Sequence, residues 1–441
     1  MSNSLQSSPF GVNVRFLSFQ FLVSMLIPCY AYGDGWSGEI RTEYRYFRDE
    51  AANETSSQAG LTQSLTPQQV NILNSFLATQ EPRGKKDPTI AFEVGYQTRL
   101  DEDADFSFKT FFRYDGMDHY RTHYDVRELV WHKRVSGDVG PLDLRIGIDK
   151  VFWGVAESNH LIDVINQTDA IEDIDKSEKL GQPMVRLATR RSWGTVELFI
   201  LPYFHEPTWA GPDGRLRPPQ ALTDVPVQYE SAAKQHHTDI AIRWSKSYGD
   251  GDIGIYYFKG TNRTPRSTQS ATAVTDQNPL GLILNYDQMR QVGLEATYLA
   301  GDWILKTELM YRYTQNEDYR AAVYGGEYPF DGVFGTSWDV SAFLERSYDS
   351  RGSNSVAELQ NDVFVGAHFS LNDAQSTQLK FGLMQDLSDA SRSVRLEASR
   401  RIRDNTVLKF EGQYFHKIAP ENPLYIIQAD SYVQLSLQYF F

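Results

Sequence analysis

Charged side chains alternate with apolar ones along many segments of this chain, and charges in this pattern can do chemistry. In one example, Lys306 and Glu308 alternate with Leu305 and Leu309. Because successive side chains of a β-strand point to opposite faces, the charges of such a segment gather on one face. A wall that carries both signs can orient ions and hydrated polar solutes. The candidate wall residues are Arg113, Arg127, Arg145, Lys150, Arg186, Arg190, Lys306, Glu308 and Arg312.

A second concentration of charge lies between residues 155 and 179, where apolar residues also recur at helix-like spacing. Its candidate acidic residues are Asp163, Asp169, Glu172, Asp173 and Asp175. If this segment folds inward against basic wall residues, it forms a constriction whose transverse field selects solutes by charge and size. If it folds outward, it is a surface loop. The wall charges also have an alternative reading, a ring of salt bridges that merely solvates a wide lumen.

Motifs for nucleotide, metal and catalytic sites are incomplete in this sequence. The stretch Gly249 to Gly254 fits the spacing G-x-G-x-x-G, but strand-like residues follow it in place of a helix. The stretch Asp173 to Ser177 begins like a calcium loop but lacks the mid-loop glycine and the closing glutamate. Ser431 and His416 would suit a rim-sited lipid hydrolase, yet no third group is evident to orient the histidine. We expect no cofactor, no metal and no catalytic residue; the lipid hydrolase is the lower alternative.

The last ten residues indicate the element that positions these charges. Val433, Leu435 and Leu437 alternate with polar residues, and the sequence closes on Phe441. Period-two alternation predicts a strand with one apolar and one polar face. A free, hydrophobic edge strand invites aggregation through its unpaired backbone groups. We therefore expect this strand to pair with the first strand, near 36–48, and to close a barrel.

About sixteen such segments recur along the chain, each near the length that a tilted strand needs to cross a bilayer. Fourteen and eighteen strands are the alternatives. We predict an all-β fold, a closed antiparallel up-and-down transmembrane β-barrel, with residues 32–441 as its single domain. Every second connection is short, which predicts short periplasmic turns and long extracellular loops. The expected loops lie near 49–87, 154–183, 205–235, 260–288, 314–357 and 417–431.

The assignment of side chains to the two faces follows the same alternation in each strand. In the segment 123–131, Tyr124 belongs to the outward face and Arg127 to the inward face. If the alternation continues without interruption, Val130 points outward and Trp131 points inward.

Residues 1–31 predict a signal peptide. Arg15 precedes an apolar run that Pro28 ends, and the small residue Ala31 offers a cleavage site. Cleavage there would remove Cys29, the sole cysteine, which suits an oxidising periplasm. The sequence holds no run of eighteen apolar residues, so no transmembrane helix is expected. The net charge of −14 argues against a general nucleic-acid binder, which would be basic.

Two stretches resemble outer-membrane proteins. The ending, with Phe441 last and Tyr439 third from last, is similar to the C-terminal signal of Gram-negative outer-membrane β-barrels. This resemblance implies a place in the bacterial outer membrane and recognition of both residues by the barrel-assembly machinery. The stretch from Gly147 to Asp169 resembles a pattern of porin-like proteins, including relatives of the alginate-export porins, with Gln167 where proline is usual. Those pores have a predominantly basic lumen, so the mixed charges here argue against an acidic polysaccharide.

Taken together, these features point to a porin-like channel of the outer membrane. We expect small hydrophilic or charged solutes to pass a water-filled lumen, or the barrel to be the export pore of a larger system. The expected partners are outer-membrane lipid, the barrel-assembly machinery and small solutes, with no nucleic acid. The alternative from a different class is a surface adhesin or assembly platform, in which long tyrosine-rich loops form the binding surface.

Overall fold

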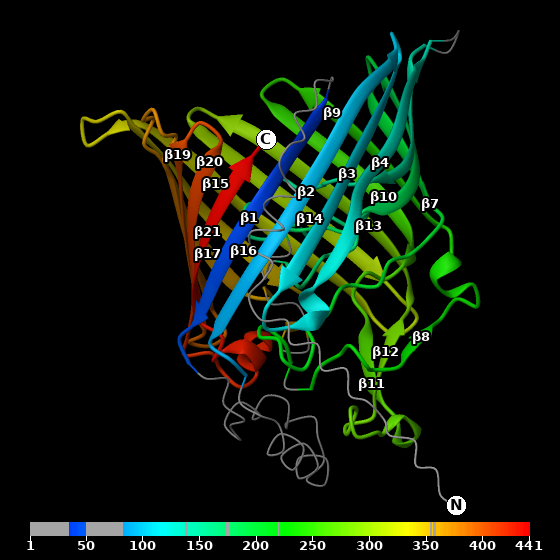
Figure 1. Cartoon of the computed structure of the whole chain (residues 1–441). Helices are drawn as coiled ribbons and strands as arrows, with labels where there is room; N and C mark the ends of the chain where they lie inside the picture. The colour runs from blue at the N-terminus through cyan, green and yellow to red at the C-terminus, as the bar shows by residue number, and fades with distance from the viewer. Residues whose placement is uncertain are drawn as a thin grey trace, which may run out of the picture.

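The computed structural model describes residues 35–49, 83–136, 140–172, 177–218, 220–352, 355 and 359–441. The expected signal peptide and most of the expected loop 49–87 lie outside these residues. So do the candidate residues Asp173 and Asp175. The described chain forms one large sheet and one small sheet (Figure 1).

Eighteen antiparallel strands form the large sheet, and each pairs with the strands before and after it. They are β1 (Trp36–Phe47), β2 (Lys86–Asp101), β3 (Ala104–Asp115), β4 (His123–Val135), β5 (Leu142–Asp149), β6 (Gln182–Arg191), β7 (Gly194–Leu201), β9 (Asp239–Tyr248), β10 (Gly251–Thr261), β13 (Gln288–Ala300), β14 (Trp303–Tyr313), β15 (Asp318–Val333), β16 (Trp338–Asp349), β17 (Asp362–Ser370), β18 (Gln378–Asp386), β19 (Arg392–Arg403), β20 (Thr406–His416) and β21 (Tyr432–Phe440).

The last strand closes the sheet into a barrel. β21 pairs with β20 on one side and with β1 on the other, in a register that sets Glu39 opposite Phe440. Figure 1 shows β1 and β21 side by side. Beyond the register, Gly38 and Phe441 exchange backbone hydrogen bonds of 2.9 and 3.0 Å. A Cβ at Gly38 would lie 2.2 Å from the tip of the Phe441 ring, so the ring rests directly on this glycine. The sheet therefore has no open edge.

The closed antiparallel barrel is confirmed, but the expected count of sixteen strands is wrong. Both additional strands, β15 and β16, lie within 314–357, which we expected to be the longest loop. In β15 the apolar side chains do not keep to one face, since Tyr319 is buried inside while Tyr324 is 53% exposed outside. Glycine, proline and aspartate in this stretch are typical of loops. Pairing with β14 and β17 nevertheless supplies a complete ladder for the hairpin.

The connections differ in length at the two ends of the barrel. Turns such as 102–103, 192–193, 249–250 and 404–405 occupy the upper end in Figure 1. The connections 150–181, 202–238, 262–287 and 417–431 leave from the lower end. They carry the small sheet of β8 (Val227–Tyr229), β11 (Arg266–Gln269) and β12 (Leu282–Tyr286). Short 3-10 turns also occur: η2 (His119–Arg121), η3 (Lys234–His236), η4 (Ala271–Ala273) and η6 (Pro423–Ile427). None of the helices in the described chain is long and apolar enough to cross a membrane.

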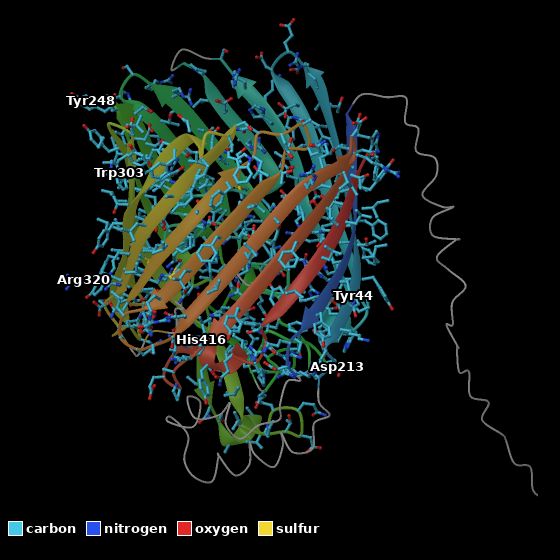
Figure 2. All side chains as sticks on the ribbon, turned by 90° about the vertical axis from the view of Figure 1, so that its left-hand side faces the viewer. Tyr44, Asp213, Tyr248, Trp303, Arg320 and His416 are labelled. Atoms are coloured by element: carbon cyan, nitrogen blue, oxygen red, sulfur yellow. The ribbon has the colours of Figure 1, made fainter. Side chains whose placement is uncertain are left out.

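The two faces of the barrel wall have opposite chemistry. Large apolar side chains cover the outside, where Leu435 is 51% exposed and Leu309 is 44% exposed. Figure 2 shows Tyr44 and Trp303 at this outer surface. Buried charged groups lie inside, including Arg113 and Glu308. A water-soluble protein buries its apolar face, so this arrangement is inverted relative to one.

A β-bulge overturns the expected orientation of two side chains in β4. The pairing of β3 with β4 shifts between Lys109 and Thr110, which inserts one residue into β4. Past the bulge the alternation is reversed. Val130 therefore points inward and is 1% exposed, whereas Trp131 points outward and is 39% exposed.

Candidate functional site

The described residues of the connection between β5 and β6, 150–172 and 177–181, lie inside the barrel, and we call them the inner loop. Its Trp153, Ile162, Val164 and Ile165 are 0–3% exposed. They pack against apolar inward residues of the wall, namely Met184, Phe199, Leu201, Ala241, Tyr256, Phe258 and Met289. Burial of these apolar surfaces holds the loop on the wall from β6 to β13. Inward apolar residues are therefore found where the loop covers the wall.

Two glutamates of the wall bind the backbone of the inner loop. Glu308 on β14 accepts hydrogen bonds from the N–H groups of Val155 (2.8 Å) and Ala156 (3.0 Å). Glu345 on β16 accepts from the N–H groups of Glu157 and Ser158, both at 2.8 Å. The Ser158 hydroxyl also donates to Glu345, at 2.6 Å. Because the loop starts at β5 and reaches β14 and β16, it crosses the lumen.

Asn166 ties the two ends of the inner loop together. Its Oδ1 accepts from the N–H of Val151 at 2.9 Å. Its Nδ2 donates to the carbonyls of Asp149 and Leu180, both at 2.9 Å. One buried side chain thus joins the end of β5 to the segment that precedes β6, and it satisfies backbone groups that the crossing leaves unpaired.

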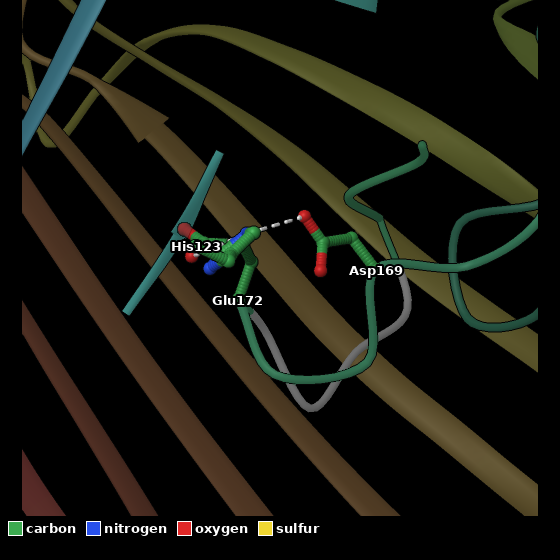
Figure 3. A group of neighbouring side chains, drawn as sticks. All are labelled: His123, Asp169 and Glu172. Atoms are coloured by element: carbon green, nitrogen blue, oxygen red, sulfur yellow. Dashed lines mark hydrogen bonds and ion pairs between the residues drawn. The ribbon is translucent and has the colours of Figure 1, made fainter. Parts of the chain in front are cut away.

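The acidic part of the inner loop meets basic residues of β3 and β4. Arg113 donates to both carboxylate oxygens of Glu172, each at 2.6 Å, and to Glu43 on β1 at 2.5 Å. Arg127 pairs with Asp169 at 2.8 Å. Figure 3 shows His123 beside Asp169, where the ring nitrogen lies 3.3 Å from the carboxylate. Four candidates from the sequence, Arg113, Arg127, Asp169 and Glu172, are thus brought together.

Burial and neighbouring cations compete at Asp169 and Asp163, and the pKa values of the two residues shift in opposite directions. Burial by itself would raise the pKa of Asp169, but the hydrogen bond with His123 and the charge of Arg127 hold this pKa below its ordinary value. Asp163 accepts from the N–H of Trp153 and pairs with Lys179 at 3.1 Å. There burial raises the pKa of Asp163 more than the Lys179 charge lowers it.

His123, Asp169 and Glu172 also have the chemistry and the spacing of a metal site, since one ligand atom of each lies within 4.8 Å of the others. Both oxygens of Glu172 already accept hydrogen bonds from Arg113. Asp169 is engaged by Arg127 and by the Thr208 hydroxyl. Two guanidinium groups thus supply the positive charge that a cation would bring, and the arrangement favours an ion-pair network.

The other candidate wall residues form separate pairs along the wall. Arg145 binds Asp149 at 2.7 Å, and Lys306 binds Glu327 at 2.8 Å. Arg186 pairs with Glu197. Lys150 lies 3.8 Å from Glu178. Arg312 donates to the neutral acceptors Gln291 and Asn262. Arg190 is exposed and forms no ion pair with a described residue. These residues do not converge on one site, and Glu308 binds the loop rather than standing free.

Sequence reasoning missed two residues that position the inner loop. Glu345 lies in a strand that was expected to be loop, so its inward orientation was not foreseen. Asn166 stood within the porin-like pattern but carried no assigned role. Period-two alternation within 338–349 could have identified Glu345, because it places Leu344 on the outward face and Glu345 on the inward face.

Outside its apolar contact with the inner loop, the wall also carries partly exposed charged side chains. We call the inward faces of β17 to β21 and of β1 to β3 the passage wall; within it, Arg113 and Glu43 are buried against the loop, with side chains 1% and 4% exposed. Other charged side chains of this wall are partly exposed, for example 26% for Arg41 and 35% for Glu397. On the covered wall the packed residues are 0–3% exposed. Charged inward residues of β5 and β6 are also partly exposed, 27% for Arg145 and 30% for Arg186, so partly exposed charges lie on both sides of the loop.

Two cavities flank the inner loop. A cavity of about 250 Å³ lies between the loop and the long connections, and Arg45, Ile171, Trp209 and Leu424 are among its lining residues. A cavity of about 580 Å³ lies toward the short turns and is lined in part by Trp153, Arg190, Arg243 and Glu295. The inner loop forms part of the lining of both cavities.

The two residues that would suit a lipid hydrolase do not form a catalytic pair. The Ser431 hydroxyl accepts from the backbone N–H of Phe415 at 3.1 Å. The His416 ring lies 3.5 Å from the Tyr414 hydroxyl. In the described chain no hydrogen bond joins His416 to Ser431, so the contact that nucleophilic catalysis requires is missing.

No known family matches the sequence, and no curated protein matches it. Solved structures match in outline only. The OmpF of Salmonella typhi in complex with daunomycin shares 8% identity over 92% of this chain and 97% of its own, with a TM-score of 0.42. OmpT of Vibrio cholerae shares 10% identity over 92% and 98%, with a TM-score of 0.41. A mutant of the Rh. blastica porin shares 9% over 92% and 99%, with a TM-score of 0.40. Likeness at this level assigns no function.

Proposed function

We propose that the protein is a channel of the bacterial outer membrane that passes small hydrophilic or charged solutes along the passage wall. The observation that carries this proposal is the inner loop, which crosses the lumen and covers one part of the wall while charged side chains elsewhere inside the barrel stay partly exposed. If protein filled the barrel completely, the charged side chains inside it would be buried rather than partly exposed. A wide barrel without a loop would not select by size.

The membrane location is supported by the inverted faces of the barrel. Apolar residues outside and polar residues inside suit a barrel surrounded by lipid. We place the short turns in the periplasm and the long connections outside the cell. Tyr439 and Phe441 stack at a centroid distance of 6.5 Å at the end of β21. We assign these two rings to recognition by the barrel-assembly machinery.

Purified protein in a planar bilayer tests the channel. We expect stepwise, ohmic conductance that depends on the salt concentration. Protein unfolded by heating before its addition is the control and should produce no steps. Folded protein that inserts into the bilayer without conducting would overturn the proposal.

The membrane location makes a separate prediction for Leu435, which lies on the outer face near the middle of β21. Leu435→Arg should lower the unfolding free energy in lipid vesicles by about 2–4 kcal/mol, because the charge meets hydrocarbon. The same change at Tyr439, close to the rim, should cost only about 0–1 kcal/mol. Guanidinium titration of both variants measures the difference. Equal and negligible losses would indicate a water-exposed outer surface.

A further inference from the structure

The glutamates of the passage wall are engaged by neighbouring cations, whereas Asp362 on β17 and Asp386 on β18 are buried and accept hydrogen bonds from backbone N–H groups. Arg41 lies 3.2 Å from Glu43 and 3.6 Å from Glu39. Lys109 lies 3.3 Å from Glu93. The remaining group consists of one arginine and two glutamates, with Arg395 at 2.6 Å from Glu397 and 3.5 Å from Glu411. Paired in this way, the acidic groups contribute little net field to the passage.

Three neighbouring cations of the same wall, on β18 to β20, have no such partner. Lys380 on β18, Arg401 on β19 and Lys409 on β20 form no ion pair with a described residue. All three are exposed. The register of the adjacent strands places them on the inward face, because Lys380 faces Glu397 and Lys409 faces Ser399. They lie near the short turns and form one patch at that end of the passage.

Most carboxylates in the described part of the inner loop are paired with cations, so they offset this patch little. Asp163 pairs with Lys179 at 3.1 Å, and Glu178 lies 3.2 Å from Arg127. Asp169 and Glu172 are held by Arg127 and Arg113. Glu157 is the one exposed carboxylate of the described loop without an ion pair. The three cations of the patch therefore outnumber the one exposed, unpaired carboxylate of the described loop.

We infer that the passage prefers anions and that Lys380, Arg401 and Lys409 determine this preference. The inference rests on the channel function proposed above and names its class of solute, small hydrated anions. Low-dielectric walls focus the field of an unpaired charge into the lumen, which raises the local concentration of anions and lowers that of cations. The charges do not bind tightly, because they remain hydrated, and an ion that enters can leave.

The reversal potential across a planar bilayer in a KCl gradient measures the preference. For the natural protein we expect chloride to permeate more readily than potassium, by a factor on the order of three. The triple variant Lys380→Gln, Arg401→Gln, Lys409→Gln should lose this preference or reverse it. Each single variant should shift the reversal potential in the same direction by a smaller amount. The single variants therefore test the inference even if the triple variant does not fold.

Arg400→Gln is the matched control. Arg400 lies beside Arg401 on the opposite, outward face of β19 and pairs with Asp373 at 3.2 Å. Its replacement should leave the reversal potential unchanged. Conductance with a potassium preference, or a triple variant as selective as the natural protein, would overturn the inferred anion preference. Either result would still be compatible with the proposed channel function. Folded protein without any conductance would overturn the channel itself.

Discussion

Replacing Glu308 and Glu345 together with alanine should raise the single-channel conductance by roughly twofold or more, because a released loop no longer narrows the lumen. The two carboxylates accept the N–H groups of Val155, Ala156, Glu157 and Ser158. Hydrogen bonds to charged groups contribute about 1.5–3 kcal/mol each, so the double variant removes most of the attachment to β14 and β16. The packing around Trp153 remains, and the barrel should keep its fold.

The matched control for this variant is Glu327→Ala. Glu327 is an inward carboxylate on β15, between the two strands that carry the anchors, but its partner is Lys306 rather than the inner loop. Its loss should leave conductance close to that of the natural protein. An unchanged conductance in the folded Glu308→Ala, Glu345→Ala variant would show that the loop does not limit the passage.

Replacing Arg113 with alanine should lower the unfolding free energy by about 3–5 kcal/mol, because it removes the closest cation from two buried carboxylates. The Arg113 side chain is 1% exposed, and those of Glu172 and Glu43 are 3% and 4% exposed. Denaturant titration in lipid vesicles, followed by tryptophan fluorescence, measures the loss. This loss should exceed that of Leu435→Arg, because Arg113 is the closest cation to two buried carboxylates, and Arg41, at 3.2 Å from Glu43 and 3.9 Å from Glu172, replaces it only in part.

Two further variants show whether the loss arises from unpaired charge. Adding Glu172→Gln to Arg113→Ala should recover part of the stability, because a neutral amide is less costly to bury than a lone carboxylate. Lys133→Ala removes an exposed pair with Asp101 and should cost only about 0–1 kcal/mol. Equal losses for Arg113→Ala and Lys133→Ala would mean that water reaches the Arg113 network.

The barrel itself was predictable because period-two alternation is a local property of a strand. The closing pair of β1 and β21 followed from an apolar strand that had to find a partner. The same rule failed for 314–357, where Tyr319 and Tyr324 place aromatic rings on both faces. The rule also failed at Trp131, since the bulge that turns it outward arises from the pairing of β3 with β4.

The sequence likewise predicted one part of the candidate site and not the other. The sequence by itself determined which residues carry charge, that Arg113 and Arg127 face inward, and that residues 155–179 form an acidic connection. It did not determine the partners of these charges, because residues far apart in the sequence become neighbours only when the barrel closes. Only the tertiary structure decided that the loop crosses to Glu308 and Glu345. The physical reason is that the loop's backbone N–H groups need acceptors inside the lumen, and two carboxylates of distant strands supply them.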